Sequence, residues 1–315
     1  MNKLEEQIQE KAIELLEKGE VSAVIGWGQG WNPTKATPLF ARDRKTAEKL
    51  IFNPFCFNNL SVYLPRLNEK VAILTKPCEA RSIVALLAEG KINRENIYII
   101  GLACQGIVDI GKLEAAIGSI NEATEARLEA DSVVVEIDGE AKKAAFADVV
   151  LDNCLSCNQQ DKTYCDVMIG EPAQVPTGKA RLIVPEDADA TWWRTFWAKE
   201  FDRCIRCYAC REACPACYCR DNCAVQSLRE RWVGPRLDAK EALMFHALRA
   251  MHVAGRCIEC GACERACPMD IPLTLLHRQV GDAVRRLFNF NVGEKADIRP
   301  PLEFFLKEEL EKSGR

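Results

Sequence analysis

The chain has 315 residues, of which 48% are hydrophobic and 28% charged, as in an ordinary globular protein of two or three domains. Its net charge of -4 argues against the basic surface that nucleic-acid binding requires. Neither an apolar run of about 18 residues nor a signal-peptide core is found. We therefore expect a cytoplasmic protein without membrane insertion, whose 17 cysteines serve as metal ligands rather than disulfides.

Up to about residue 187 the sequence has an α/β pattern, in which short β-branched runs alternate with helical periodicity. Two of the runs are typical of buried parallel strands, and the helix between them ends at Gly90. The predicted elements are a helix at 4–18, a strand at 21–27, a helix at 41–51 begun by Asp43, a strand at 71–76, a helix at 79–90, and strands at 97–102 and 132–137, the last followed by an Asp-Gly turn. We expect residues 1–187 to form an α/β domain with a small, mostly parallel sheet.

From about residue 190 the patterns become helical. The helices expected there are 190–201, 239–255 and 271–288, and residues 171–190, with three prolines, read as a linker. We expect an all-α domain at 188–287. Residues 288–315, which contain a proline pair and a charged helix, would form a tail.

Two identical cysteine runs lie in this helical part. Each has the spacing C-x2-C-x2-C-x3-C-P, which places three thiolates of one 4Fe-4S cluster on a tight loop and sends the fourth to the other cluster. The predicted ligand sets are Cys204, Cys207, Cys210 and Cys267 for one cluster, and Cys257, Cys260, Cys263 and Cys214 for its partner. Zinc favours pairs of C-x2-C over such four-cysteine runs.

The second run and the residues after it, "CIECGACERACPMDIPLTLL", resemble the α-helical two-cluster ferredoxin domain of heterodisulfide reductase C-type and succinate dehydrogenase iron–sulfur subunits. This resemblance covers roughly residues 195–285 and implies two 4Fe-4S clusters. Three cysteines remain beside the first run: Cys217, Cys219 and Cys223. They could hold a further cluster or a zinc ion if Cys56 or Cys165 supplied a fourth ligand, or they could lie as free thiols beside the first cluster.

Two cysteines of the α/β part occupy equivalent places. Cys78 and Cys104 each come seven residues after the start of a predicted strand. If these strands are parallel neighbours, both thiols emerge at the carboxyl edge, where open α/β sheets bind ligands. The pair Cys154 and Cys157 follows the strand-like segment 148–152. Four thiolates converging there would hold a third 4Fe-4S cluster, whereas the alternative is that Cys78 and Cys104 are small buried residues.

The segments "AVIGWG", "NPFCFNN", "AILTKPCEARSI", "YIIGLACQ" and "CLSCNQQDKTYCDVMIGE", in this order, resemble the beta subunit of deazaflavin-reducing (coenzyme F-type) hydrogenases and formate dehydrogenases. The resemblance spans about residues 20–175 and implies one 4Fe-4S cluster framed by Cys78, Cys104, Cys154 and Cys157. The chain departs from the family at the flavin and deazaflavin sites. It lacks the glycine-rich helix with which family members begin, and Cys165 stands where they tend to have alanine.

Other signals point to no further chemistry. The glycine-rich stretch 26–33 follows a strand but does not lead into a helix, so we expect a surface or cofactor-lining turn rather than a dinucleotide site. His246, His252 and His277 lie on predicted helices, where packing is the default role. No arrangement for hydrolytic catalysis is recognisable.

Two functions follow from these observations. The first is an iron–sulfur electron-transfer subunit of an anaerobic oxidoreductase complex, which relays single electrons through three or more 4Fe-4S clusters. Its partners would be a flavin- or metal-containing subunit and a hydrogenase-, formate dehydrogenase- or heterodisulfide reductase-like subunit. The alternative is a flavoprotein that binds FAD and exchanges hydride with a deazaflavin or nicotinamide. Only this alternative would make the chain itself catalytic.

Overall fold

A computed structural model describes residues 3–303, apart from 156, 158–163, 172, 173, 175, 220, 221 and 227–231. The chain divides into two compact units. The first comprises Met1–Ala80 and Asn93–Ile183, and the second comprises Arg81–Ile92 and Val184–Arg315. In the described part of the chain, no helix is long and apolar enough to cross a membrane.

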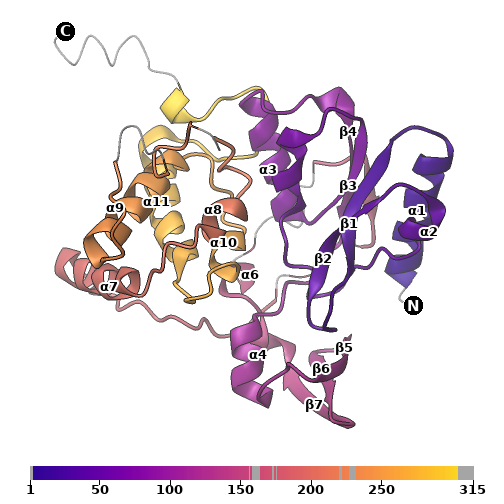
Figure 1. The fold of residues 1–315 in the computed structure, drawn as a ribbon, viewed down its shortest axis with the longest axis horizontal. Coiled ribbons are helices and arrows are strands. Elements are labelled where there is room, and N and C mark those ends of the chain that lie inside the picture. Colours follow the sequence, from indigo (N-terminus) through magenta and orange to yellow (C-terminus); the bar gives the residue numbers. More distant parts are fainter. Residues whose placement is uncertain are drawn as a thin grey trace. The chain divides into compact units, whose positions relative to one another are not determined.

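The first unit is built on a five-stranded sheet of order β2-β1-β3-β4-β8 (Figure 1). Its strands are β1 (Ala23–Gln29), β2 (Ala36–Ala41), β3 (Val71–Thr75), β4 (Ile97–Leu102) and β8 (Val167–Ile169). Only β2 runs antiparallel to its neighbour, so the sheet is mostly parallel, as predicted. Helix α1 (Lys3–Glu17) packs against β1 and β8 through an apolar stripe that buries Ile8, Ala12 and Leu15.

Strands β3 and β4 are parallel neighbours, which confirms the arrangement on which the third cluster was predicted. Their register pairs Val71 with Ile97. Helix α3 (Pro77–Ala88) and the 3-10 turn Arg94–Asn96 connect them. The last residue of the helix is Ala88. The predicted Gly90 terminates it just beyond, since this residue has φ +62° and its N–H donates to the Leu87 carbonyl at 2.9 Å.

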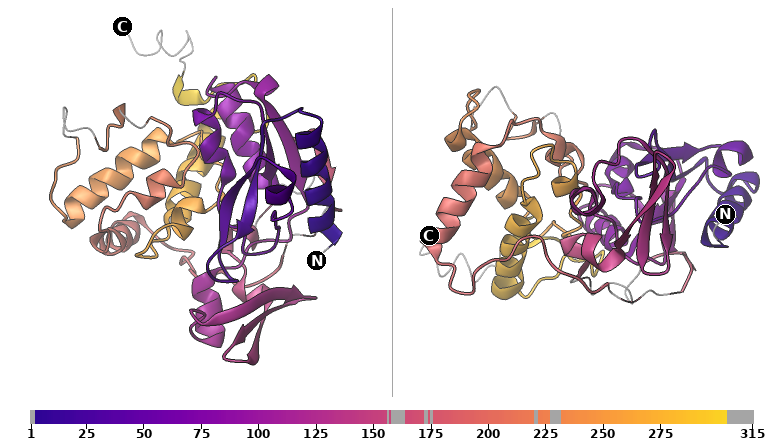
Figure 2. Two further views of the ribbon diagram at one scale, coloured as in Figure 1. Left: turned by 45° about the vertical axis from the view of Figure 1, so that its right-hand side comes forward. Right: turned by 90° about the horizontal axis from the view of Figure 1, so that it is seen from below.

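A second sheet of the same unit is antiparallel, with order β5-β6-β7 (Figure 2). It consists of β5 (Ala123–Glu129), β6 (Ser132–Ile137) and β7 (Glu140–Ala145), covered by α4 (Ile110–Ile117) and α5 (Phe146–Val149). The predicted Asp-Gly turn joins β6 to β7, and both turn residues have positive φ, 53° for Asp138 and 80° for Gly139. This is the backbone of a tight hairpin turn.

Some elements of the first unit differ from the prediction. Residues 148–152 do not form a strand: α5 ends at Val149, and Val150 makes only an isolated bridge to Val108. Strand β2 was not predicted, because Pro38 removes a backbone donor, a loss that an edge strand tolerates. The predicted helix at 41–51 is one turn, α2 (Arg44–Ala47), capped by Asp43. The other short elements are the 3-10 helix Leu60–Arg66 and α6 (Asp152–Leu155).

The described elements of the second unit are helical. They are α7 (Ala190–Asp202), α8 (Ala209–Glu212), α9 (Ala239–His252), α10 (Ala262–Arg265), α11 (Leu273–Phe288) and the 3-10 turn Pro301–Glu303. The long helices lie where the sequence predicts them, and α9 contacts both α7 and α11. The charged helix expected near the end of the tail falls outside the described residues.

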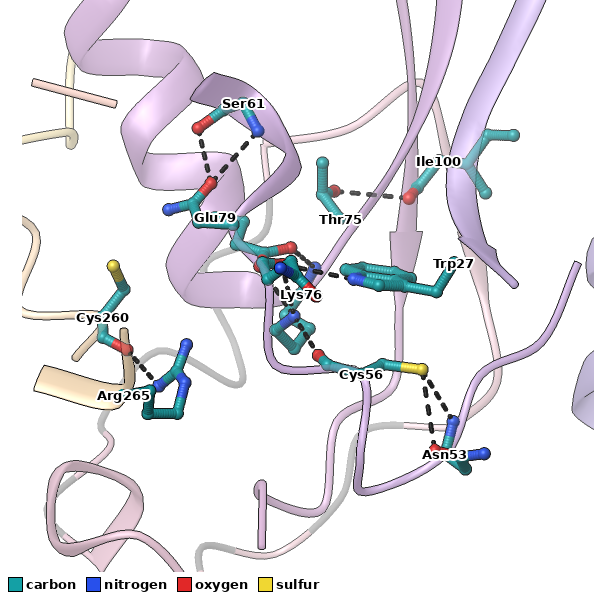
Figure 3. Close-up of polar contacts among 12 residues, drawn as sticks. Trp27, Asn53, Cys56, Ser61, Thr75, Lys76, Glu79, Ile100, Cys260 and Arg265 are labelled. Carbon is teal, nitrogen blue, oxygen red and sulfur yellow. Dashed lines mark hydrogen bonds and ion pairs between the residues drawn. The ribbon is translucent and has the colours of Figure 1, made fainter. Parts of the chain in front are cut away.

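An ion pair is buried in the core of the first unit, at the carboxyl end of β3. Lys76 and Glu79 are 2% and 1% exposed, and Lys76 Nζ lies 2.6 Å from Glu79 Oε1 (Figure 3). The ammonium group also donates to the Cys56 carbonyl at 2.7 Å and lies 4.1 Å from the centre of the Trp27 ring. These contacts replace water around the Lys76 ammonium group. The buried charge of each residue is therefore stabilised only while its partner is present.

The substitution Lys76→Met should therefore destabilise the first unit by about 3–5 kcal/mol, since it leaves the Glu79 carboxylate buried without its cation. Lys18→Met, which removes an exposed partner of Glu14, should leave the free energy of unfolding nearly unchanged, because water and salt screen such a pair. Urea unfolding of both variants, followed by circular dichroism, compares the two. Equal costs for the two variants would contradict the buried-pair account.

Candidate iron–sulfur centres

The two cysteine runs of the second unit have the same local backbone. In the first run, the residues on either side of Cys207 have positive φ, 47° for Arg206 and 62° for Tyr208. In the second, the residues flanking Cys260 repeat this, with 59° for Glu259 and 72° for Gly261. Each loop then enters a one-turn helix, α8 or α10. Non-glycine residues adopt positive φ angles only at an energetic cost. The same angles in both runs therefore indicate that the two loops are held in one specific conformation.

Four thiols line one cavity of the second unit: Cys214, Cys257, Cys260 and Cys263. Three of them come from the second run, and the other is the last cysteine of the first run. Burial raises the pKa of the Cys257 thiol well above its usual value, and nearby Cys214 raises it further. Burial likewise raises the pKa of Cys263 to about 12. Metal binding would have to deprotonate these thiols, so metal and folding would be coupled here.

The cysteines of the other predicted set also lie near one another. Burial raises the pKa of the Cys204 thiol, and neighbouring Cys267 and Cys207 add to the rise. Burial raises the pKa of Cys210 to about 12, again with contributions from Cys267 and Cys204. Cys267 belongs to the second run, so the structure brings it near Cys204 and Cys210 of the first run.

A chain of aromatic rings borders this set. Trp193, Trp197 and Phe201 of α7 stack in sequence, and the Phe201 ring stacks on His246 with centroids 4.4 Å apart. His246 Nε2 in turn lies 3.4 Å from Cys204 Sγ. Trp197 and Phe201 belong to the same apolar core as Cys210 and Cys263. The tryptophans thus pack the core and shield the cysteines at once.

The spare cysteines are placed differently. Cys217 hydrogen-bonds the Cys214 thiol, which lowers the pKa of Cys217. Cys219 is exposed and Cys223 is buried. Across the described residues, no three His, Cys, Asp or Glu side chains are positioned to hold a single metal ion. Cys56 lies in the core of the first unit, with Sγ 3.4 Å from Asn53 N (Figure 3). Cys165 precedes β8 by two residues.

In the first unit, Cys104 lies near Cys154 and Cys157, beyond the carboxyl end of β4. Cys78 is the second residue of α3, and Cys104 follows β4 by two residues. Burial raises the pKa of the Cys104 thiol to about 12, and the nearby thiols of Cys154 and Cys157 contribute. Cys154 lies on the helical turn α6 and not on a loop after a strand, because residues 148–152 are not a strand.

Among the buried polar residues of the cysteine region, His246, Arg249 and His277 were not predicted to have a role there. His246 and His277 are each 2% exposed, whereas His252 is exposed. His246 and Arg249 are three residues apart, on the apolar face of α9 that also carries Ala242 and Phe245. A histidine and an arginine on an apolar stripe between two cysteine runs are the signal that could have revealed them.

The glycine-rich stretch 26–33 has no dinucleotide-binding geometry. It forms the end of β1 and a turn into β2, so no helix begins there to meet a pyrophosphate. A separate open cleft of about 1410 Å³ in the first unit is lined by α1, β5, β8 and the residues on either side of Cys104. The cleft has room for a flavin-sized ligand.

Comparison with known families finds two adjacent matches in this chain. Residues 68–201 match the family model for the C-terminal part of the beta subunit of coenzyme F420 hydrogenases and dehydrogenases, and residues 203–272 match the "4Fe-4S dicluster domain". The second match contains both cysteine runs. The first contains Cys78, Cys104, Cys154 and Cys157.

Two curated relatives are similar over nearly the whole chain. The F420-dependent formate dehydrogenase subunit beta of Methanocaldococcus jannaschii is 25% identical over 91% of this chain and 91% of its own length. Formate dehydrogenase 1 subunit beta of Methanococcus maripaludis, also F420-dependent, is 26% identical over 91% of this chain and 90% of its own. A chain of the F420-reducing [NiFe] hydrogenase complex from Methanosarcina barkeri shares 17% identity over 48% of this chain and 62% of that one, with a TM-score of 0.37. The chain therefore contains a segment similar to the C-terminal part of the beta subunit of coenzyme F420 hydrogenases and dehydrogenases, followed by a segment that matches a 4Fe-4S dicluster domain.

Proposed function

We propose that this chain is the electron-relay subunit of a larger oxidoreductase and holds three 4Fe-4S clusters. Such clusters accept and release one electron at a time, at potentials set by their protein environment. The observation that carries the proposal is the cavity lined by Cys214, Cys257, Cys260 and Cys263, because it joins a cysteine of one run to three of the other. This exchange of the fourth ligand is what two-cluster domains with this spacing require.

The chain's own residues fit the clusters in donor type and number. Cys214, Cys257, Cys260 and Cys263 would hold one, and Cys204, Cys207, Cys210 and Cys267 its partner. Cys78, Cys104, Cys154 and Cys157 would hold the third, at the carboxyl edge of the parallel sheet. Ligands of a cubane each bind a different iron, so these sets need not crowd around one point as zinc ligands do.

We assign the third cluster to an α/β domain of residues 1–187 and the other two to an all-α ferredoxin domain of residues 188–287, followed by a tail, 288–315. The division of the chain after Ile183 supports the boundary. It also groups Arg81–Ile92 with the second unit, a segment that sequence patterns alone would leave in the first.

The partners of the chain would be other subunits of a hetero-oligomeric enzyme. The curated relatives are themselves beta subunits of F420-dependent formate dehydrogenases, which supports a partner of the formate dehydrogenase class. An FAD would convert hydride chemistry to single electrons. We place it in the partner rather than in this chain, because the glycine-rich stretch 26–33 leads into a strand and no helix begins there to meet a pyrophosphate.

Coulometry on the oxygen-free protein tests the relay. A relay should take up about three electrons per chain in one-electron steps. It should stay oxidised when only reduced deazaflavin or NADH is offered, because neither gives up single electrons readily. A two-electron step, or reduction of the isolated chain by either hydride donor, would contradict the relay and favour the flavoprotein.

A further inference from the structure

Arg249 of α9 is buried between the two cysteine runs. Its side chain is 3% exposed, and its Nη2 donates to the carbonyl oxygen of Cys210 at 3.0 Å. Its Nη1 lies 2.7 Å from Nε2 of His277 on α11. Arg249 also lines the cavity formed by Cys214 and the cysteines of the second run. One guanidinium group therefore contacts the first run and faces the thiols of the second.

Among the described residues, no carboxylate forms an ion pair with Arg249. Its hydrogen-bond partners there are the Cys210 carbonyl, the His277 imidazole and the Cys217 thiol. The thiols of Cys214, Cys257 and Cys263 line the same cavity as Arg249. A buried cation without a counter-ion is costly, so the structure calls for negative charge at these sulfurs.

The neighbours of Arg249 supply unused hydrogen-bond donors at the same cavity. Arginine can only donate, so His277 Nε2 must accept and His277 Nδ1 must carry the proton. His277 Nδ1, Arg249 Nε and Thr274 Oγ1 are buried and have no hydrogen-bond partner in the described part of the molecule. All three residues line the cavity of the four thiols. Buried donors are rarely left unsatisfied, and cluster sulfurs are acceptors that would satisfy them.

We propose that Arg249 is a positioning residue that acts as the shared counter-ion of the two clusters of the second unit and raises the reduction potentials of both. The inference rests on the proposed function, since it needs both clusters. Each cluster becomes more negative when it gains an electron, and a nearby positive charge stabilises that state. The buried position of Arg249 keeps water from screening the effect. One residue thereby sets the two potentials together.

The test is a redox titration of the full chain with dithionite, followed by electron paramagnetic resonance (EPR), after iron has been counted. Arg249→Gln should keep its iron and shift both midpoints to lower potential. At a fixed potential, the ratio of reduced to oxidised cluster should fall at least about tenfold. This corresponds to a midpoint shift of about 59 mV for a one-electron couple. Arg249→Lys, which keeps the charge, should restore most of the shift. Arg286→Gln is the matched control: it removes the same charge from an exposed position on α11, so its effect should be screened and small.

Equal midpoints in Arg249→Gln and Arg286→Gln, or a shift of only one cluster, would overturn the shared counter-ion. Arg249→Gln could instead lose iron while Arg249→Lys keeps both its iron and the two wild-type midpoints. In that case the positive charge is required and the proposal stands. If Arg249→Lys also loses iron, the residue is structural and the proposal falls. Failure of the proposed function would appear earlier, as a wild-type chain without the two clusters.

Discussion

Cys214→Ala is expected to remove the cluster held by Cys257, Cys260 and Cys263, although residue 214 lies more than forty residues away from them in the sequence. The reason is that Cys214 lines their cavity and supplies its fourth thiol. Iron should fall from about 12 to about 8 per chain. The EPR spectrum of the reduced variant should match that of Cys257→Ala and differ from that of Cys204→Ala.

Cys217→Ala provides the control for this experiment. Cys217 lies three residues further along the chain and hydrogen-bonds the Cys214 thiol, but we place it outside every ligand set. Its removal should leave iron and spectra unchanged. If Cys217→Ala loses iron and Cys214→Ala does not, the ligand has been assigned to the wrong thiol. If Cys214→Ala instead reproduces the spectrum of Cys204→Ala, the cross-ligation is wrong.

Cys104→Ala should remove the cluster of the first unit and leave the other two intact. Cys104 is 8% exposed and lies beside Cys154 and Cys157 at the carboxyl edge of β4. A cluster that loses one of its four ligands here has no replacement thiolate in its set. Iron should again fall to about 8 per chain, but the EPR signals of the second unit should persist.

Cys56→Ala is the matched control for Cys104→Ala. Both thiols are buried in the first unit, and burial raises the pKa of each to about 12. In the part of the chain that the structure describes, however, the hydrogen-bond partners of the Cys56 thiol are Asn53 and the Ile51 carbonyl, and no thiol of the predicted ligand set is among them. Its variant should therefore keep all its iron. Equal iron in the two variants at the wild-type level would show that Cys104 is not a cluster ligand.

Much of the fold can be predicted from the sequence, because its signals are local. The apolar runs of β3 and β4 require burial on both faces, and their equal offsets to Cys78 and Cys104 survive in the observed register. The Asp-Gly pair between β6 and β7 fixes a hairpin through two positive φ angles. The family resemblance suggested by these motifs agrees with the matches at 68–201 and 203–272.

The sequence-based predictions are wrong or incomplete where tertiary packing overrides a local sequence pattern. Residues 148–152 are apolar like a strand, but Val149 and Val150 pack in the core with α4 and the antiparallel sheet rather than pairing along an edge. Strand β5 carries mostly half-exposed and charged residues, so no alternation marks it. Arg249 and His277 are 28 residues apart in sequence, and only the packing of α9 against α11 brings them to one cavity.

The central claim is that one chain holds three 4Fe-4S clusters and no flavin. Its most direct test is the amount of iron, acid-labile sulfide and flavin per chain in protein purified without oxygen. The relay predicts about 12 irons, the same amount of sulfide and no flavin. About 8 irons would contradict the site at Cys78, Cys104, Cys154 and Cys157, and one tightly bound flavin would contradict the relay in favour of a hydride-exchanging enzyme.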